Sequence, residues 1–138
     1  MREYKFRGFD AVGNKGWVYG DLVHNKKVTK TGLEDRVMVG GYEVVPESVG
    51  QFTGLHDKKG KEIFEGDIIK ITDNESEDNS NEEVKFYKGV YGVDNWTVNT
   101  KNRSLTTLNF FMPTIGLYDE EQEYTVEVIG TIYEQKNK

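Results

Sequence analysis

The stretch from Val49 to Ile71 constrains the fold of this chain more than any other part of its sequence. In it, Asp57-Lys58-Lys59-Gly60 has the pattern of a type I turn, with an aspartate that bonds its own backbone and a glycine that takes a left-handed conformation. The β-branched and aromatic residues after this turn are typical of a strand. The stretch therefore predicts two strands joined by a tight reversal.

A glycine and an aspartate interrupt the second of these strands. Glu65-Gly66-Asp67 separates the apolar pair Ile63-Phe64 from Ile68-Ile69. Glycine permits a positive φ at such a corner, and the carboxylates of Glu65 and Asp67 can accept hydrogen bonds from the freed amides. Small, strongly bent barrels of the Src-homology-3 type turn corners in this way. We therefore expect a structural role for both carboxylates.

The chain before this stretch is predicted to contain four short strands. Residues 4–7 and 17–19 alternate apolar with polar side chains around Gly13-Asn14-Lys15-Gly16, which indicates a hairpin. Leu22-Val23-His24 is expected to continue the second strand into a basic turn at residues 25–30. The other elements predicted here are strands over residues 37–39 and 42–45, separated by Gly40-Gly41, and a helical turn at Pro46-Glu47-Ser48.

An acidic run, DNESEDNSNEE, occupies residues 73–83 and contains no apolar side chain. Such a composition predicts a solvated loop between two strands. A calcium loop of the EF-hand type requires glycine at its sixth position and glutamate at its twelfth. Asp78 and Val84 occupy those positions, so the pattern does not match.

The chain after the acidic run alternates further strand candidates with turns. Residues 104–108 fit either a strand or a short helix capped by Ser104. Residues 124–133 form the longest clean strand, with a bend expected at Gly130. The other candidates are strands over residues 84–87, 90–91, 96–98 and 105–111, with turns at Lys88-Gly89 and Asp94-Asn95.

Several segments resemble the YopX family of phage and prophage proteins. Residues 50–55, 57–60 and 63–68 resemble the central motif of that family, KFRG and WVYGDL near the start resemble its opening, and VIGTIYE near the end resembles its closing strand. No motif is evident between Thr72 and Glu123, and Thr131 stands where the family pattern has asparagine. The resemblance implies a phage or prophage accessory protein of unknown biochemical activity.

Composition and charge narrow the possible functions. The absence of cysteine excludes disulfides, thiolate metal sites and cysteine nucleophiles. A net charge of −6 disfavours broad attraction to nucleic acid or anionic membranes. No apolar run approaches the roughly 20 residues that span a bilayer, and the N-terminus lacks the apolar core of a signal peptide. We therefore expect a protein of the host cytoplasm with no membrane partner.

The predicted function is that of a non-catalytic binding or assembly module, and two alternatives to it remain. A weak carboxylate-based hydrolase would need two of Glu65, Asp67, His56 and His24 to converge in a deep pocket. A small barrel that binds nucleic acid would use cations interleaved with aromatic side chains. The candidates for that nucleic-acid or partner surface are Lys85, Lys88, Lys101 and Arg103, beside Phe86, Tyr87, Tyr91 and Trp96. No catalytic residue, cofactor or metal ligand set is predicted.

The fold prediction is a mainly β protein with an N-terminal β-rich segment, residues 1–49, and a small bent barrel of Src-homology-3 type, residues 50–138. The structural motif comprises Gly54, Asp57, Gly60, Glu65, Gly66 and Asp67. The expected barrel core comprises Phe52, Leu55, Ile63, Phe64, Ile68, Ile71, Val84, Phe86, Trp96, Val126, Val128 and Ile132. Residues 1–49 carry more large apolar side chains than so short a segment can cover, which predicts a homo-oligomer with two-fold pairing.

Overall fold

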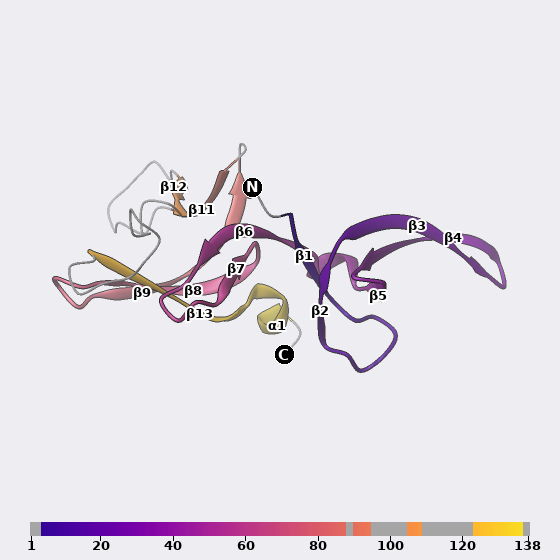
Figure 1. The fold of residues 1–138 in the computed structure, drawn as a ribbon, viewed down its shortest axis with the longest axis horizontal. Helices are drawn as coiled ribbons and strands as arrows, with labels where there is room; N and C mark the ends of the chain where they lie inside the picture. Colours follow the sequence, from indigo (N-terminus) through magenta and orange to yellow (C-terminus); the bar gives the residue numbers. More distant parts are fainter. Residues whose placement is uncertain (1–3, 88–89, 95–104, 109–122, 137–138) are drawn as a thin grey trace. The chain divides into compact units, whose positions relative to one another are not determined.

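The computed structural model describes residues 4–87, 90–94, 105–108 and 123–136, and Figure 1 shows their strands. The chain is mainly β, and it divides into two compact units, residues 1–54 and 55–138. The strands described form small antiparallel sheets. Among the described residues, no helix is long and apolar enough to cross a bilayer.

In the first unit, one sheet is built on the predicted N-terminal hairpin. Strand β1 (Phe6–Phe9) pairs antiparallel with β2 (Trp17–Gly20), and it also pairs with the start of β6 (Gly50–His56). The carboxylate of Asp10 holds the intervening loop, because it accepts the N–H groups of Val12, Gly13 and Lys15 at 3.1 to 3.2 Å. The hairpin prediction is therefore confirmed.

The second sheet of this unit contains β3 (Leu22–Thr29), β4 (Gly32–Val39) and β5 (Tyr42–Val44), in that order. Gly40 and Gly41 separate β4 from β5, as predicted, and both have positive φ in this turn. The 3₁₀ helix η1 (Pro46–Ser48) confirms the predicted helical turn. Five strands therefore precede residue 49, rather than the four predicted.

The predicted basic turn at residues 25–30 is wrong. Residues 25–29 belong to β3, and the chain reverses at Lys30 and Thr31 instead. Strand β3 is also separate from β2, since Gly20 has a φ of 146° and Asp21 lies between the two strands. The lysines misled the prediction because a polar two-stranded ribbon and a basic loop have similar compositions.

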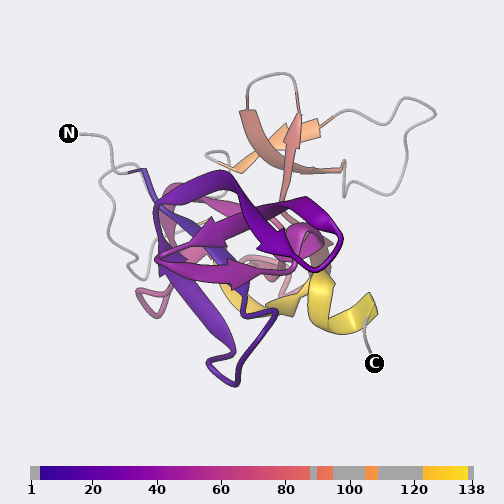
Figure 2. The same ribbon diagram turned by 90° about the vertical axis from the view of Figure 1, so that its right-hand side faces the viewer.

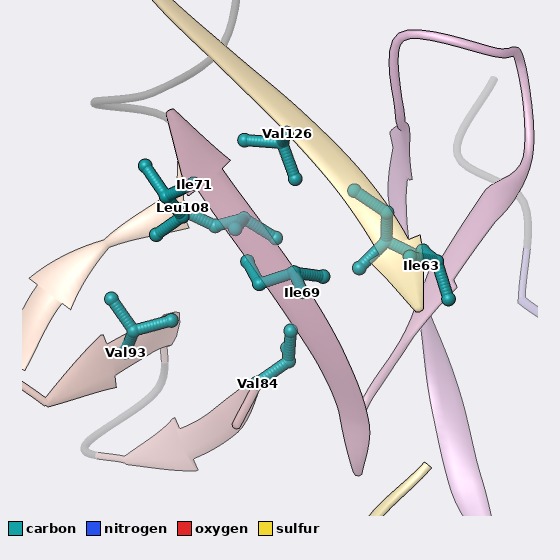
Figure 3. Packing of buried hydrophobic residues seen from close by; sticks show 8 residues of the cluster. Ile63, Ile69, Ile71, Val84, Val93, Leu108 and Val126 are labelled. Atoms are coloured by element: carbon teal, nitrogen blue, oxygen red, sulfur yellow. The ribbon is translucent and has the colours of Figure 1, made fainter. Parts of the chain in front are cut away.

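Each unit has its own hydrophobic core. Val18, Val39 and Val44 are buried in the first unit, with Phe6, Leu22, Val37 and Val49 packed against them. In the second unit, Figure 3 shows side chains from several strands that meet in one cluster. Its buried members are Ile63, Ile69, Ile71, Val84, Val93, Leu108, Val126 and Val128.

The described residues of the second unit form two three-stranded sheets. One has the order β13-β8-β9 and the other β10-β11-β12. The strands of these sheets, together with the short strand β7, are β7 (Glu62–Phe64), β8 (Asp67–Asp73), β9 (Asn79–Glu83), β10 (Lys85–Tyr87), β11 (Val90–Asp94), β12 (Leu105–Thr107) and β13 (Tyr124–Thr131). Among the described strands, no ladder closes these sheets into a barrel. Residues 105–107 form a strand, which decides between the two alternatives for that segment.

The acidic run is only partly a loop. Residues 74–78 form the turn, but Asn79–Glu83 form strand β9, which pairs with β8 from Ile68 to Thr72. The Asp73 carboxylate starts the turn by accepting the N–H groups of Glu75 and Ser76. A backbone ladder needs no apolar side chains of its own when the neighbouring strand supplies the buried face.

Three members of the predicted core lie elsewhere, and one of them, Phe52, is buried but belongs to the first unit. Phe86 is 51% exposed, although Val84, two residues before it, is fully buried. The N–H and C=O of Val84 bond the backbone of Asp67 and Gly66, next to the pairing of β9 with β8, whereas Phe86 pairs with Tyr91 in a different sheet. Ile132 is the first residue of the short helix α1 (Ile132–Lys136), which Figure 2 shows in yellow after β13. Trp96 lies outside the described residues.

The predicted turn and corner are confirmed. Gly54, Gly60 and Gly66 have φ values of 86°, 81° and 91°. The Asp57 carboxylate accepts the N–H groups of Lys59 and Lys61, both at 2.9 Å. Asp67 is fully buried, and its Oδ2 accepts the N–H of Phe64 at 2.7 Å. Glu65 is half-buried at the same corner.

Candidate binding surface

The hairpin of β3 and β4 extends beyond the sheet that supports it. Strand β5 pairs only with Val37–Val39 of β4, so residues 25–36 form a two-stranded ribbon. Figure 1 shows this ribbon as a long curved hairpin, and Figure 2 looks along it from its tip. An isolated two-stranded ribbon is marginally stable in water, so it is stabilised when another layer covers it.

Local side-chain bonds build the tip of this hairpin. The Thr29 hydroxyl accepts the N–H of Thr31 at 3.3 Å and donates to the carbonyl of Gly32 at 3.0 Å. Gly32 has a φ of 130°. These bonds fix the reversal at Lys30 and Thr31, and with it the register of all the pairs between β3 and β4.

Alternation along the two strands divides the hairpin into two faces. Leu22 and Val39 are opposite each other and belong to the core of the first unit. Every second residue from that pair lies on the same side, which we call the core-side face. Going outward, this face carries the pairs His24 and Val37, Lys26 and Asp35, and Val28 and Leu33.

The outermost pair of the core-side face is apolar and exposed. Val28 lies directly opposite Leu33 in the ladder, and their exposed fractions are 83% and 64%. Single exposed apolar residues are ordinary, but an adjacent cross-strand pair on a projecting ribbon forms a small continuous patch. The charged pair of Lys26 and Asp35 separates this patch from the apolar side chains that begin in the core.

A cavity of about 440 Å³ lies at the base of the same hairpin. Val37 and Pro46 supply apolar parts of its wall, and His24, Lys26 and Asp35 supply polar groups from the core-side face. Asn25 and Arg36 complete its lining. Its volume is large enough for apolar side chains of a partner.

Most cations of the hairpin already have polar partners. The Lys26 ammonium lies 2.7 Å from Asp35, and this hydrogen bond and the lysine charge lower the pKa of Asp35. Lys27 lies 3.0 Å from Glu43 of β5. The Arg36 Nε donates to the Asn25 Oδ1 at 2.6 Å. Among the described residues, only Lys30 at the tip is a hairpin cation without such a partner.

A second cavity of the first unit, about 520 Å³, adjoins the Asp10 loop. It is lined by Asp10, Val12, Gly13, Asn14 and Lys15, and by Gly41, Tyr42 and Glu43 from the β4–β5 turn. The Lys15 ammonium lies 6.0 Å from the centre of the Tyr42 ring. The three backbone bonds of Asp10 lower its pKa and hold its carboxylate in the loop. That carboxylate therefore has a structural role.

The predicted nucleic-acid surface is described only in part. Lys85 is in β10, whereas Lys88, Lys101 and Arg103 lie outside the described residues. Phe86 and Tyr91 are opposite each other in the β10–β11 ladder, with ring centres 4.9 Å apart. The exposed face of Phe86 therefore belongs to an aromatic pair next to Lys85.

Among the residues of the hydrolase alternative, His24 lies at a cavity and Asp67 at the Gly66 corner. His24 lines the 440 Å³ cavity, whose lining includes neither His56, Glu65 nor Asp67. Asp67 is buried, and its Oδ2 accepts the amide of Phe64. In the part of the chain that the structure describes, no group of three His, Asp or Glu side chains could hold a metal ion.

Sequence reasoning missed Val28 and Leu33. A signal was present, because both flank a threonine- and glycine-containing segment, Thr29-Lys30-Thr31-Gly32, that suits a short turn. The neighbouring lysines hid this alternation. The exposed pair is therefore a surface that only the register of the hairpin reveals.

Comparison with known proteins places the chain in a family. The family model described as YopX protein matches residues 5–137. The chain belongs to the YopX family. A solved structure of protein EF1440 from Enterococcus faecalis is 22% identical, with 99% of this chain and 97% of that chain covered and a TM-score of 0.51. This likeness concerns the fold alone.

A second solved structure, of protein yopX from Bacillus subtilis, is 23% identical. The match covers 94% of this chain and 93% of that chain, with a TM-score of 0.47. No curated protein matches this member of the YopX family.

Proposed function

We propose that this YopX family member is a non-catalytic binding module that contacts a protein partner through the core-side face of the β3–β4 hairpin. The observation that carries this proposal is the exposed cross-strand pair of Val28 and Leu33, on the same face as a cavity whose wall includes Val37 and Pro46. Covering such a patch removes apolar surface from water and supports the ribbon with a second layer.

The polar groups near this face support binding rather than catalysis. Lys26 and Asp35 neutralise each other, and the Arg36 Nε is bound to Asn25. A general acid or base needs a carboxyl or imidazole whose pKa is matched to proton transfer, whereas the pKa of Asp35 is lowered by its lysine. The groups are arranged to orient a partner.

The resemblance of the central motif to phage and prophage proteins supplies the proposed setting, an accessory role in the host cytoplasm. We extend the proposal to the second unit, where the corner at Gly66 and the two three-stranded sheets support a small barrel of Src-homology-3 type. A crystal structure of the whole chain would test whether the sheets of the second unit close into that barrel.

Affinity capture from a lysogenic host tests the binding proposal. The tagged wild-type chain is compared with Val28→Glu/Leu33→Glu and with Val23→Glu, a control on the opposite face that is 47% exposed. Circular dichroism first verifies that all three fold. The proposal is supported if the double variant alone no longer captures a protein that the wild type captures. That protein can be an untagged copy of the chain. Identical captured proteins from all three would overturn it.

A second function, binding of single-stranded nucleic acid, is favoured by the exposure of Phe86. Phe86 and Tyr91 form a tilted aromatic pair, with Lys85 beside Phe86 in the chain. Bases stack on such rings, and cations hold the phosphates. Mobility shifts at low salt, with Phe86→Ser and Phe52→Leu as test and control, would show binding lost only in the first. No shift at micromolar protein would exclude this function.

A further inference from the structure

We propose that the partner of the core-side face is a second copy of this chain, bound so that each hairpin tip fills the cavity of the other. This inference rests on the proposed binding function and names its partner. In the arrangement, Val28 and Leu33 of one copy pack on His24, Val37 and Pro46 of the other. The contact is reciprocal, as two-fold symmetry requires.

The register of the hairpin makes this pairing self-complementary. On the core-side face, the cavity pair, His24 and Val37, lies two residues inward from Lys26 and Asp35. The apolar pair, Val28 and Leu33, lies two residues outward from them. We place a two-fold axis at the level of Lys26 and Asp35, between two hairpins whose core-side faces meet and whose tips point in opposite directions. This axis puts each apolar pair opposite the cavity pair of the other copy. Leu33 then meets Val37 of the second copy, and Val28 meets its His24.

The size of the contact favours reciprocity. Two side chains alone cover far less than the roughly 800 Å² per partner of a standard protein interface. On each partner, the reciprocal arrangement instead covers one tip, one cavity and the ribbon between them. Each cavity, at about 440 Å³, offers room for the side chains of Val28 and Leu33 together. Facing sheets pack about 10 Å apart with side chains interdigitated, which suits a tip that enters a cavity.

The charges of the hairpin favour a protein copy over nucleic acid. Nucleic acid would need several unpaired cations, whereas Lys26 and Lys27 are bound to Asp35 and Glu43. At the axis, Lys26 lies opposite Lys26 and Asp35 opposite Asp35 of the other copy, and each lysine is neutralised by the aspartate of its own hairpin, 2.7 Å away. The excess of apolar side chains in the first unit, where Tyr19 and Tyr42 are also exposed, favours self-association as well.

Sedimentation and light scattering measure the association. The wild-type chain is expected to have the mass of two chains at high concentration. Val28→Glu/Leu33→Glu places two carboxylates in the apolar contact, and it should raise the dissociation constant by about a hundredfold or more. Val23→Glu, on the opposite face, should leave that constant unchanged. A mass of one chain for the wild type over the whole concentration range would overturn the proposal.

Cross-linking tests the register, since the chain has no cysteine of its own. A tagged Leu33→Cys copy is mixed with an untagged Val37→Cys copy and treated with a short bis-maleimide. The matched control is Glu34→Cys with Met38→Cys, which have the same spacing on β4 but lie on the opposite face. Cross-linked pairs from the first mixture alone support the reciprocal contact, and pairs from the control alone contradict it.

The outcomes also separate this inference from the proposed function. If the chain is monomeric while the Val28→Glu/Leu33→Glu variant loses a captured host protein, the second copy is wrong and the binding function stands. If the hairpin variant changes neither mass nor capture, both fail. Salt-sensitive binding of DNA that Lys30→Glu abolishes, by a chain of monomeric mass, would replace the second copy with nucleic acid.

Discussion

The Asp57 carboxylate accepts a hydrogen bond from the backbone N–H of Val128, 2.9 Å away and 71 positions along the chain. The other carboxylate oxygen accepts two N–H groups of the turn that Asp57 begins. Next to it, the N–H of Lys58 donates to the carbonyl of Val126 at 2.9 Å. One buried side chain thus shapes the turn and also fixes it to strand β13.

Replacing Asp57 by alanine should destabilise the second unit strongly. The change leaves three backbone N–H groups without their acceptor, the buried one of Val128 and the part-buried ones of Lys59 and Lys61, which predicts a loss of about 3 kcal/mol in the free energy of unfolding. Asp73→Ala is the control, because its carboxylate also accepts two turn amides but lies near the surface, and it should cost about 1 kcal/mol. Urea unfolding followed by circular dichroism measures both. Equal losses would mean that the bond to Val128 contributes nothing.

Half of the role of Asp57 could be predicted from sequence. The turn depends on neighbours in the chain, so Asp57 and Gly60 reveal it. The bond to Val128 depends on where β13 pairs with β8, and no local pattern states that register. The same division applies to the core, where Ile63 and Val126 were recognised by their residue types. Phe86 was misplaced because the chain leaves the β8–β9 pairing at Val84 and enters a different sheet at Lys85, and no local pattern states that change.

The β3–β4 hairpin and the acidic run show the same limit of sequence-based prediction for polar segments. Lysines in β3 and glutamates in β9 conceal two strands whose backbone pairs are complete. Composition measures what a segment can bury, and neither strand buries much. The candidate binding surface followed only from the pairing of Val28 with Leu33.

Strand β9 should protect its amides in spite of its composition. Asn79–Glu83 pair with β8, whereas residues 74–78 lie in the turn. Hydrogen exchange at single-residue resolution should therefore be at least about tenfold slower, on average, in the strand than in the turn, since exchange there requires local opening. Equally fast exchange in both segments would restore the solvated loop that the sequence predicted.

Alanine substitutions at Gly40 and Gly41 separate the effect of backbone strain from that of a steric collision of the added Cβ. Both have positive φ, 59° and 88°, which costs an alanine about 1 to 2 kcal/mol. A Cβ on Gly41 has no atom within 4 Å, whereas a Cβ on Gly40 would collide with the carbonyl oxygen of Tyr19. Thermal unfolding should therefore show a small loss for Gly41→Ala and a clearly larger one for Gly40→Ala. Similar losses would show that the β4–β5 turn moves away from Tyr19 without penalty.

The Asp10 loop should make the stability of the first unit depend on pH. Hydrogen bonds from the amides of Val12 and Gly13 are the main cause that holds the pKa of Asp10 below its ordinary value of 3.8. Because the native pKa is the lower one, the stabilisation is complete above the ordinary value and is lost as the pH falls through the native pKa. Asp10→Asn removes the titrating group and should lower stability at neutral pH. Urea unfolding at pH 7 and pH 3 should then show a smaller difference in the variant than in the wild type. An unchanged difference would mean that the loop does not distinguish the charged from the neutral carboxyl group.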